Sequence, residues 1–177
     1  MSKLDIGSGH LHSHIARGDI NIDIKRPKVR PKNLIQADGY HLPILDNSFD
    51  KTFLYDIIEH VENPTKLMKE AFRVLKPHGL AEITTPNPWH WRKIFRVARG
   101  KKIILSGREH IATWTQAEIE NLLMNVGFKD VHVTYITLPV TRIFGSHPIL
   151  DRLMEKLLPS PIATRSIKVR ARKCIKQ

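Results

Sequence analysis

The chain has 177 residues, with 29 Lys or Arg against 17 Asp or Glu, and its formal net charge is +12 at pH 7. This length fits one domain, and 41% hydrophobic with 26% charged residues is typical of a folded protein and not of a disordered one. No apolar run approaches the roughly 20 residues that cross a bilayer, which excludes a membrane-spanning helix. The single cysteine, Cys174, excludes an internal disulfide and a cysteine-based zinc site.

The positive charge is concentrated in three segments. More than half of the basic residues fall within residues 25–32, 92–108 and 165–176. Such segments favour an anionic partner, either RNA or a membrane surface, or a phosphorylated substrate. The first residues lack the apolar core of a signal peptide, so the chain is expected in the cytoplasm, with a peripheral position at the membrane left open.

Hydrophobic periodicity predicts seven strands and several helices. The first strands are short β-like runs separated by turns, and the run at residues 20–24 has three isoleucines at period two. The predicted strands are residues 3–6, 20–24, 34–37, 51–55, 80–85, 131–137 and 166–175. The predicted helices are residues 11–17, 64–75, 89–98, 115–126 and 148–158.

Two of these helices carry clear end signals. Asn63 is a good N-cap before Pro64, and the helix that follows ends at the sequence Lys-Pro-His-Gly of residues 76–79. Thr115 and Glu118 have the spacing of a capping box, and Gly127 is a typical C-terminal stop. The helix at residues 89–98 has an apolar face and a basic face.

The order of these elements predicts an α/β fold in three layers, with helices on both sides of a mostly parallel sheet. The last two strands are joined without a full crossover pattern, which predicts an antiparallel hairpin at one edge. We interpret residues 1–177 as a single domain. Two insertions interrupt it, residues 88–112 on the expected acceptor side and residues 138–165 between the last two strands.

Polar and glycine residues follow four of the predicted strands. In an open α/β sheet the ligand binds at the carboxyl ends of the strands. Glycines there let the backbone approach a ligand, and an acidic side chain can accept hydrogen bonds from both ribose hydroxyls. In chain order these residues are Gly7, Ser8 and Gly9, then Asp23, then Asp38 and Gly39, then Tyr55 and Asp56.

This combination resembles the class I S-adenosylmethionine-dependent methyltransferases of the small-molecule type called methyltransferase 11. The resemblance covers roughly residues 3–137 and implies a Rossmann-like fold. Its most specific parts are Glu59-His60-Val61 and the helix that ends in residues 74–79. The other segments that carry it are residues 4–9, 21–23, 37–39, 42–43 and 46–50.

The resemblance implies S-adenosyl-L-methionine as the cofactor and gives each strand end a role. The glycine turn of Gly7, Ser8 and Gly9 would contact the methionine end, with Asp5 beneath it. Asp23, with Ile24 beside it, would hold the ribose, and Asp38 and Gly39 would face the adenine. Tyr55 and Asp56 would flank the sulfonium.

The sequence departs from the family pattern in two places. The position of the family's third glycine is Leu11, which moves the backbone away from the cofactor. The first strand begins almost at Met1, so we expect a minimal version of the fold that lacks the family's N-terminal helices. The site is then expected to be open on that side or covered by a second subunit of a homo-oligomer.

The acceptor side follows the fifth strand, and the apolar face of the helix at residues 89–98 is expected to be buried against the mouth of the pocket. Pro86-Asn87-Pro88 and the later Glu109-His110 resemble family members associated with glycan genes, which implies O-methylation of a small-molecule or glycan-like acceptor. Two other functions stay open, an RNA (tRNA) methyltransferase and a non-catalytic cofactor-binding or scaffold subunit.

Three histidines near these strand ends are candidate catalytic groups, because a hydroxyl acceptor benefits from a general base. His110 is the preferred base, His90 stands behind it and His60 is the third, each weighed against a purely structural role. The alternation of His10, His12 and His14 looks like a metal cluster, but it falls on a short helical or loop segment. No metal site is therefore expected.

Overall fold

The computed structural model describes residues 1–8, 17–25, 32–101, 110–136 and 148–174, with the backbone alone described for residues 148–152. The strands are β1 (Lys3–Ile6), β2 (Ile20–Asp23), β3 (Leu34–Gln36), β4 (Phe49–Tyr55), β5 (Leu75–Pro86), β6 (Phe128–Ile136) and β7 (Ser166–Lys173). The helices are α1 (Pro64–Val74), α2 (Trp91–Ala98), α3 (Gln116–Val126), α4 (Pro148–Leu157) and α5 (Ser160–Ala163).

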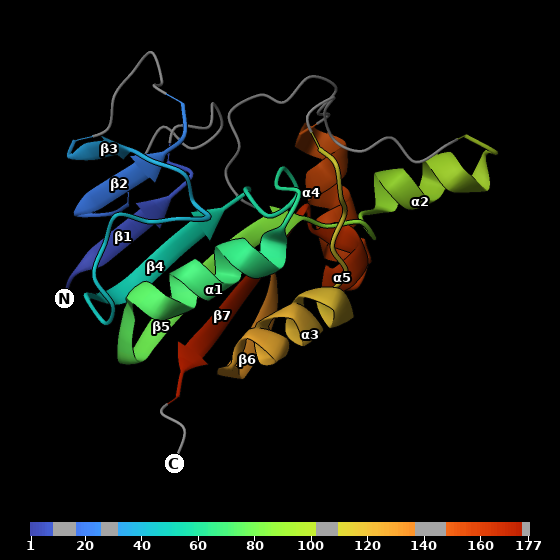
Figure 1. The fold of residues 1–177 in the computed structure, drawn as a ribbon. Coiled ribbons are helices and arrows are strands. Elements are labelled where there is room, and N and C mark those ends of the chain that lie inside the picture. The colour runs from blue at the N-terminus through green and yellow to red at the C-terminus, as the bar shows by residue number, and fades with distance from the viewer. Residues whose placement is uncertain (9–16, 26–31, 102–109, 137–147, 175–177) are drawn as a thin grey trace.

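The strands form one sheet in the order β3-β2-β1-β4-β5-β7-β6 (Figure 1). The first five strands of this order are parallel, whereas β7 is antiparallel to both β5 and β6. The predicted mostly parallel sheet with an antiparallel last hairpin is confirmed. The order reverses between β1 and β4, which is where a ligand binds in such sheets.

Helices α1 and α3 lie next to each other on one face of the sheet (Figure 1). The side chains that α1 buries are Leu67, Met68, Ala71 and Val74. Helix α3 buries Ile119 and Leu123. These residues join the buried residues of the strands in one hydrophobic core. The crossovers expected to form the other layer, together with the predicted helix at residues 11–17, lie largely outside the described residues.

The end signals read from the sequence hold in these two helices. The Asn63 side chain accepts a hydrogen bond of 2.9 Å from the Lys66 N–H. Thr115 and Glu118 form a complete capping box. Gly127 ends α3 at a φ of 118°, a left-handed conformation that favours glycine.

Strand β5 begins earlier than predicted. It starts at Leu75, directly after α1, because buried Leu75 pairs with Phe49 on β4. The register then shifts, and the next pair is Lys51 with Leu80. Residues 76–79, expected to be a turn that only ends the helix, form this irregular part of the strand, with His78 at a φ of 63°.

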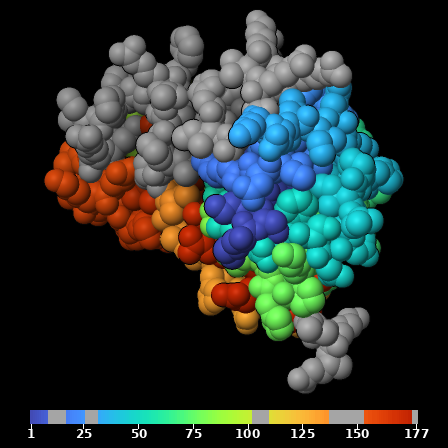
Figure 2. All heavy atoms as spheres, turned by 90° about the vertical axis from the view of Figure 1, so that its left-hand side faces the viewer, coloured from blue at the N-terminus to red at the C-terminus, as the bar shows by residue number. Residues whose placement is uncertain are grey.

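The helices of the two insertions lie at the end of the sheet away from β3 (Figure 1). Helix α2 extends outward there, and α4 and α5 pack near the start of β7 (Figure 1). Seen from the side of β1–β3, the N-terminal strands face the viewer and α4 forms one edge of the molecule (Figure 2). No helix in the described part of the chain is long and apolar enough to cross a membrane.

Candidate active site

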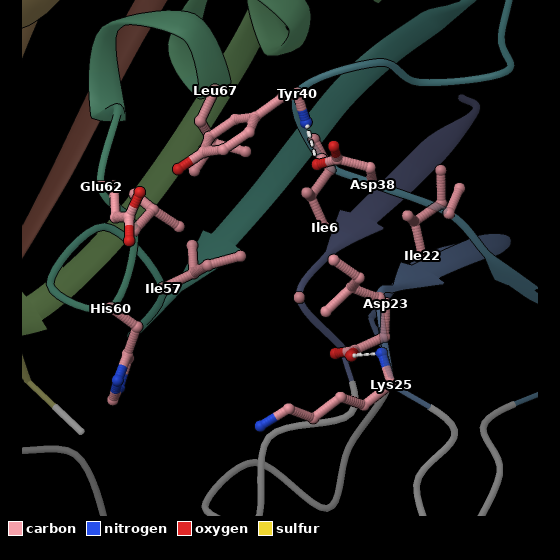
Figure 3. Close-up of a pocket in the computed structure, with 15 residues that line it drawn as sticks. Ile6, Ile22, Asp23, Lys25, Asp38, Tyr40, Ile57, His60, Glu62 and Leu67 are labelled. Atoms are coloured by element: carbon pink, nitrogen blue, oxygen red, sulfur yellow. Dashed lines mark hydrogen bonds between the residues drawn. The ribbon is translucent and has the colours of Figure 1, made fainter. Parts of the chain in front are cut away.

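A cavity of about 470 Å³ opens at the carboxyl ends of β1 and β2 and beside the loop after β3 (Figure 3). Its volume lies in the range of small-molecule and cofactor sites. Most of its lining is apolar, and three carboxylates, one histidine and one lysine add polar groups. The lining residues are Ile6, Gly7, Ile22, Asp23, Ile24, Lys25, Ala37, Asp38, Gly39, Tyr40, Ile57, His60, Val61, Glu62 and Leu67.

Gly7 leaves room at the end of β1. Its φ is +80°, and its N–H donates a hydrogen bond of 2.8 Å to the Ile22 carbonyl. A Cβ atom built there would come within 2.4 Å of the Ile57 Cδ1 atom. Any side chain at this position would therefore require a left-handed backbone and would push Ile57 aside.

The two acidic residues predicted after β2 and β3 both line the cavity. The Asp23 Oδ1 atom accepts a hydrogen bond of 2.8 Å from the Lys25 N–H, which fixes the carboxylate at the cavity wall (Figure 3). The Asp38 Oδ1 atom accepts one of 2.8 Å from the Tyr40 N–H. That backbone hydrogen bond, more than any other contact, lowers the pKa of Asp38.

Of the ten residues predicted to contact the cofactor, five line the cavity. They are Gly7, Asp23, Ile24, Asp38 and Gly39. Asp5, Ser8, Tyr55 and Asp56 are not among the lining residues, and Gly9 lies outside the described part of the chain. The sequence analysis did not single out the apolar wall, because Ile6, Ile57 and Leu67 look like ordinary core residues before the fold is known.

The other four described residues make contacts within the protein. Buried Asp5 accepts a hydrogen bond of 3.0 Å from the Arg17 N–H, and its burial raises its pKa to about 6. Ser8 is buried, and its N–H donates a hydrogen bond of 3.1 Å to the Ile22 carbonyl. The Tyr55 hydroxyl donates to Glu82. Asp56 accepts a 3.0 Å hydrogen bond from the Thr84 hydroxyl.

Two of the three candidate catalytic histidines lie together. The rings of His60 and His110 meet edge to face, with 4.4 Å between their centroids. His60 also lines the cavity. Backbone hydrogen bonds hold the segment before α3 against the turn after β4. One of them, 2.9 Å long, runs from the Ile111 N–H to the Glu59 carbonyl. The fold thus brings His110 to the edge of the pocket.

Glu59 is a further ionisable group at this place, and it was not among the predicted site residues. Its side chain is 1% exposed, and Oε2 accepts a 3.1 Å hydrogen bond from the Thr85 hydroxyl. Burial, with a contribution from the charge of Asp56, raises its pKa to about 8. The sequence held one signal for this residue, because Glu59 stands next to His60 in the motif Glu59-His60-Val61.

The third histidine and helix α2 lie elsewhere. His90 is 6% exposed, precedes α2 and is not among the residues that line the cavity. The apolar face of α2, expected to be buried against the pocket mouth, is exposed. The reason is that Asn87 anchors the chain before the helix. Its side-chain amide donates hydrogen bonds of 2.8 Å to the carbonyls of Pro161 and Thr164, which direct the chain toward α5.

Comparison with known proteins shows which proteins the chain is similar to. The sequence profile of the methyltransferase domain family, Methyltransf_11, matches residues 4–83. The protein named "Probable S-adenosylmethionine-dependent methyltransferase" in Mycobacterium tuberculosis H37Rv is 32% identical over 98 residues, which are 55% of this chain and 33% of that protein. A demethylmenaquinone methyltransferase of Lactobacillus johnsonii is 27% identical over 139 residues, covering 66% of this chain and 57% of that one.

The fold agrees with solved structures of the same class. The crystal structure of an S-adenosylmethionine-dependent methyltransferase from Archaeoglobus fulgidus superposes with a TM-score of 0.67 at 17% identity, over 97% of this chain and 85% of that one. In fold and in sequence the chain is similar to the class I S-adenosylmethionine-dependent methyltransferases. It spans about a third of the length of the mycobacterial relative.

The described residues fit S-adenosyl-L-methionine, the cofactor of this family. The cavity combines apolar walls for a flat base with the Asp23 carboxylate, which can accept hydrogen bonds from a ribose diol. Gly7, which has no side chain, lets Ile57 of the cavity wall lie close against the end of β1. Ile24 and Tyr40 supply apolar surface next to the carboxylates of Asp23 and of the loop after β3.

Proposed function

We propose that this chain transfers a methyl group from S-adenosyl-L-methionine to an oxygen atom of a small-molecule or glycan-like acceptor. The cofactor supplies the activated methyl group. The observation that carries the proposal is one cavity whose wall holds the Asp23 and Asp38 carboxylates at one side and the His60 ring at the other. This arrangement supports a cofactor site that borders directly on an acceptor site.

The chain's own residues would bind and orient the two reactants. Asp23 would hold the ribose hydroxyls, and the apolar wall would enclose the base. Holding an acceptor in line for transfer can supply several kcal/mol of the barrier. His110, whose ring contacts that of His60, would orient the acceptor hydroxyl and receive its proton.

Calorimetric titration with S-adenosylhomocysteine tests the cofactor site. Asp23→Ala should weaken binding by roughly 1.5–3 kcal/mol, because charge-assisted hydrogen bonds to the ribose are lost. Asp130→Asn is the matched control, since Asp130 is exposed near the start of β6 and asparagine tolerates its φ of 48°. Equal affinity of the Asp23→Ala variant and the wild type would refute the ribose assignment.

His110→Ala separates the acceptor side from the cofactor side. It should lower methyl transfer to hydroxyl-bearing acceptors and leave the affinity for S-adenosylhomocysteine nearly unchanged, because the histidine would act on the acceptor. Transfer at the wild-type rate would refute this role. Loss of cofactor affinity would instead mean that His110 only supports the pocket.

A second proposal concerns α2, and its observation is independent. We infer that this helix rests on an anionic membrane surface. The exposed apolar side chains of α2 are Ile94, Phe95 and Val97, and Trp89 just before the helix adds a fourth, all at 40–55% exposure. The segment from Trp89 to Lys101 contains several Lys and Arg residues and no acid. An apolar face beside basic side chains fits an interfacial helix better than an RNA-binding surface.

A further inference from the structure

Three side chains of metal-binding types lie together at the wall of the pocket. One carboxylate oxygen of Glu59 and one ring nitrogen each of His60 and His110 all lie within 4.8 Å of one another. Glu59 and His60 come from the turn after β4, whereas His110 comes from the segment before α3. The described residues contain no second cluster of this kind.

The environment of Glu59 points to a missing cation. Its Oε1 atom has no hydrogen-bond partner among the described residues, although the side chain is 1% exposed. A buried carboxylate oxygen without a partner costs free energy, and such an atom calls for an explanation such as an ion. The nearby Lys93 ammonium does not provide the partner, because its Nζ atom makes no hydrogen bond either.

We propose that Glu59, His60 and His110 bind a divalent transition-metal ion, of which Zn²⁺ is the representative. Two imidazoles and one carboxylate are a donor set that such ions accept. Bonds of about 2.1 Å bring two ligand atoms to within about 4.2 Å of each other. Small side-chain rotations reach this separation from the 4.8 Å of the present arrangement.

This cluster could not be recognised from the sequence, from which no metal site was expected. Glu59 and His110 are far apart in the chain, and they meet only because the segment at Ile111 is hydrogen-bonded to the turn after β4. The cluster suggested by the alternation of His10, His12 and His14 lies outside the described residues and does not enter this proposal.

Three protein ligands leave a coordination position open, as in catalytic and not in structural zinc sites. Because His60 also lines the cofactor cavity, an ion held here would lie at the border of the acceptor side. It could then bind an acceptor oxygen and favour its deprotonated form, with His110 acting through the ion. This role rests on the proposed function, whereas the binding of the ion does not.

The experiment is a titration of the metal-free chain with Zn²⁺ by calorimetry and with Co²⁺ by visible absorption. We expect one site per chain and a d–d spectrum of nitrogen and oxygen ligation. Glu59→Gln, which keeps the size of the buried side chain, and His110→Ala should each weaken binding at least tenfold. His132→Ala should bind as the wild type does, since His132 is exposed on β6.

The design separates this site from other histidines and from the cofactor site. A variant with His10, His12 and His14 all changed to alanine should retain the site. If that variant loses the metal, or if Glu59→Gln and His110→Ala bind as tightly as the wild type, the proposal is wrong. Circular dichroism verifies the fold of each variant. Should His110→Ala unfold, Glu59→Gln still decides, and S-adenosylhomocysteine affinity reports separately on the proposed function.

Discussion

Gly7 at the end of β1 faces Ile57 in the turn after β4, so closely that a Cβ atom on Gly7 would lie 2.4 Å from the Ile57 Cδ1 atom. The φ of Gly7 is +80°. Backbone conformation and space thus both require glycine here. Both residues line the cavity, so their close contact ties the pocket to the packing around it.

Gly7→Ala should lower the free energy of unfolding and weaken S-adenosylhomocysteine binding. The left-handed backbone alone costs an alanine about 1–2 kcal/mol, and displacement of Ile57 adds to it. Gly100→Ala is the control for the backbone part, since its φ is +69° and nothing lies within 4 Å of the new Cβ. Urea unfolding should show a larger loss for Gly7→Ala than for Gly100→Ala, with an equal loss refuting the steric argument.

The charge of Asp5 should make stability depend on pH. Burial raises the pKa of Asp5 from 3.8 to about 6, despite the hydrogen bond from Arg17. A raised carboxyl pKa contributes stability that is complete below pH 3.8 and is lost as the pH rises through 6. Asp5→Asn stays neutral and should therefore be the more stable form at pH 7, by up to about 3 kcal/mol.

The measurement is the difference in unfolding free energy between Asp5→Asn and the wild type from pH 4 to pH 7.5. At pH 4 both side chains are largely neutral in the folded state, so that point serves as the internal control. The difference should grow through the window and then level off. A difference that stays constant across the window would mean that Asp5 does not change its charge there.

The pKa of Glu82 is shifted in the opposite direction from that of Asp5. Burial raises the pKa of Glu82, but hydrogen bonds from Lys168, Tyr55, Lys51 and Arg170 outweigh burial and hold that pKa at about 2. Three of these partners are cations at 2.7–3.1 Å. The stability from Glu82 is therefore present above pH 4.5 and is lost as the pH falls through 2.

Glu82→Gln should lower the unfolding free energy at pH 7 by about 2–4 kcal/mol, because the cations on both neighbouring strands lose their counter-charge. Tyr55→Phe removes one neutral donor from the same carboxylate and should cost only about 1 kcal/mol. Thermal and urea unfolding of the two variants measure both values. Equal effects of the two variants would show that the ion pairs contribute little.

Local signals in the sequence predicted the elements well where one segment determines its own structure. The capping box at Thr115 and the left-handed end at Gly127 hold as predicted, because both depend on neighbouring residues. The start of β5 at Leu75 could not be predicted, since it depends on pairing with Phe49. The cation cluster around Glu82 likewise requires the order β4-β5-β7.

In the candidate site, too, some residues could be identified from local sequence signals and others only from the fold. Asp23 and Asp38 could be found because each follows directly on a strand, and the carboxyl ends of parallel strands share one edge. The grouping of Glu59 with His110 could not be found from the sequence, because it requires the chain after β5 to return to the turn after β4. The exposure of α2 was missed because the anchor of Asn87 involves residues more than 70 positions away.

Vesicle flotation tests the membrane surface assigned to α2. The chain should float with vesicles that contain phosphatidylserine, remain behind with purely zwitterionic ones, and lose binding as salt rises, because screening weakens the attraction of its basic side chains. Joint replacement of Trp89 and Phe95 by alanine removes two exposed aromatic side chains and should reduce binding about tenfold or more. Leu45→Ala is the matched control, because Leu45 is 83% exposed and lies away from α2. If the wild type ignores anionic vesicles but binds cellular RNA at low salt, the basic surface serves nucleic acid and the membrane assignment is wrong.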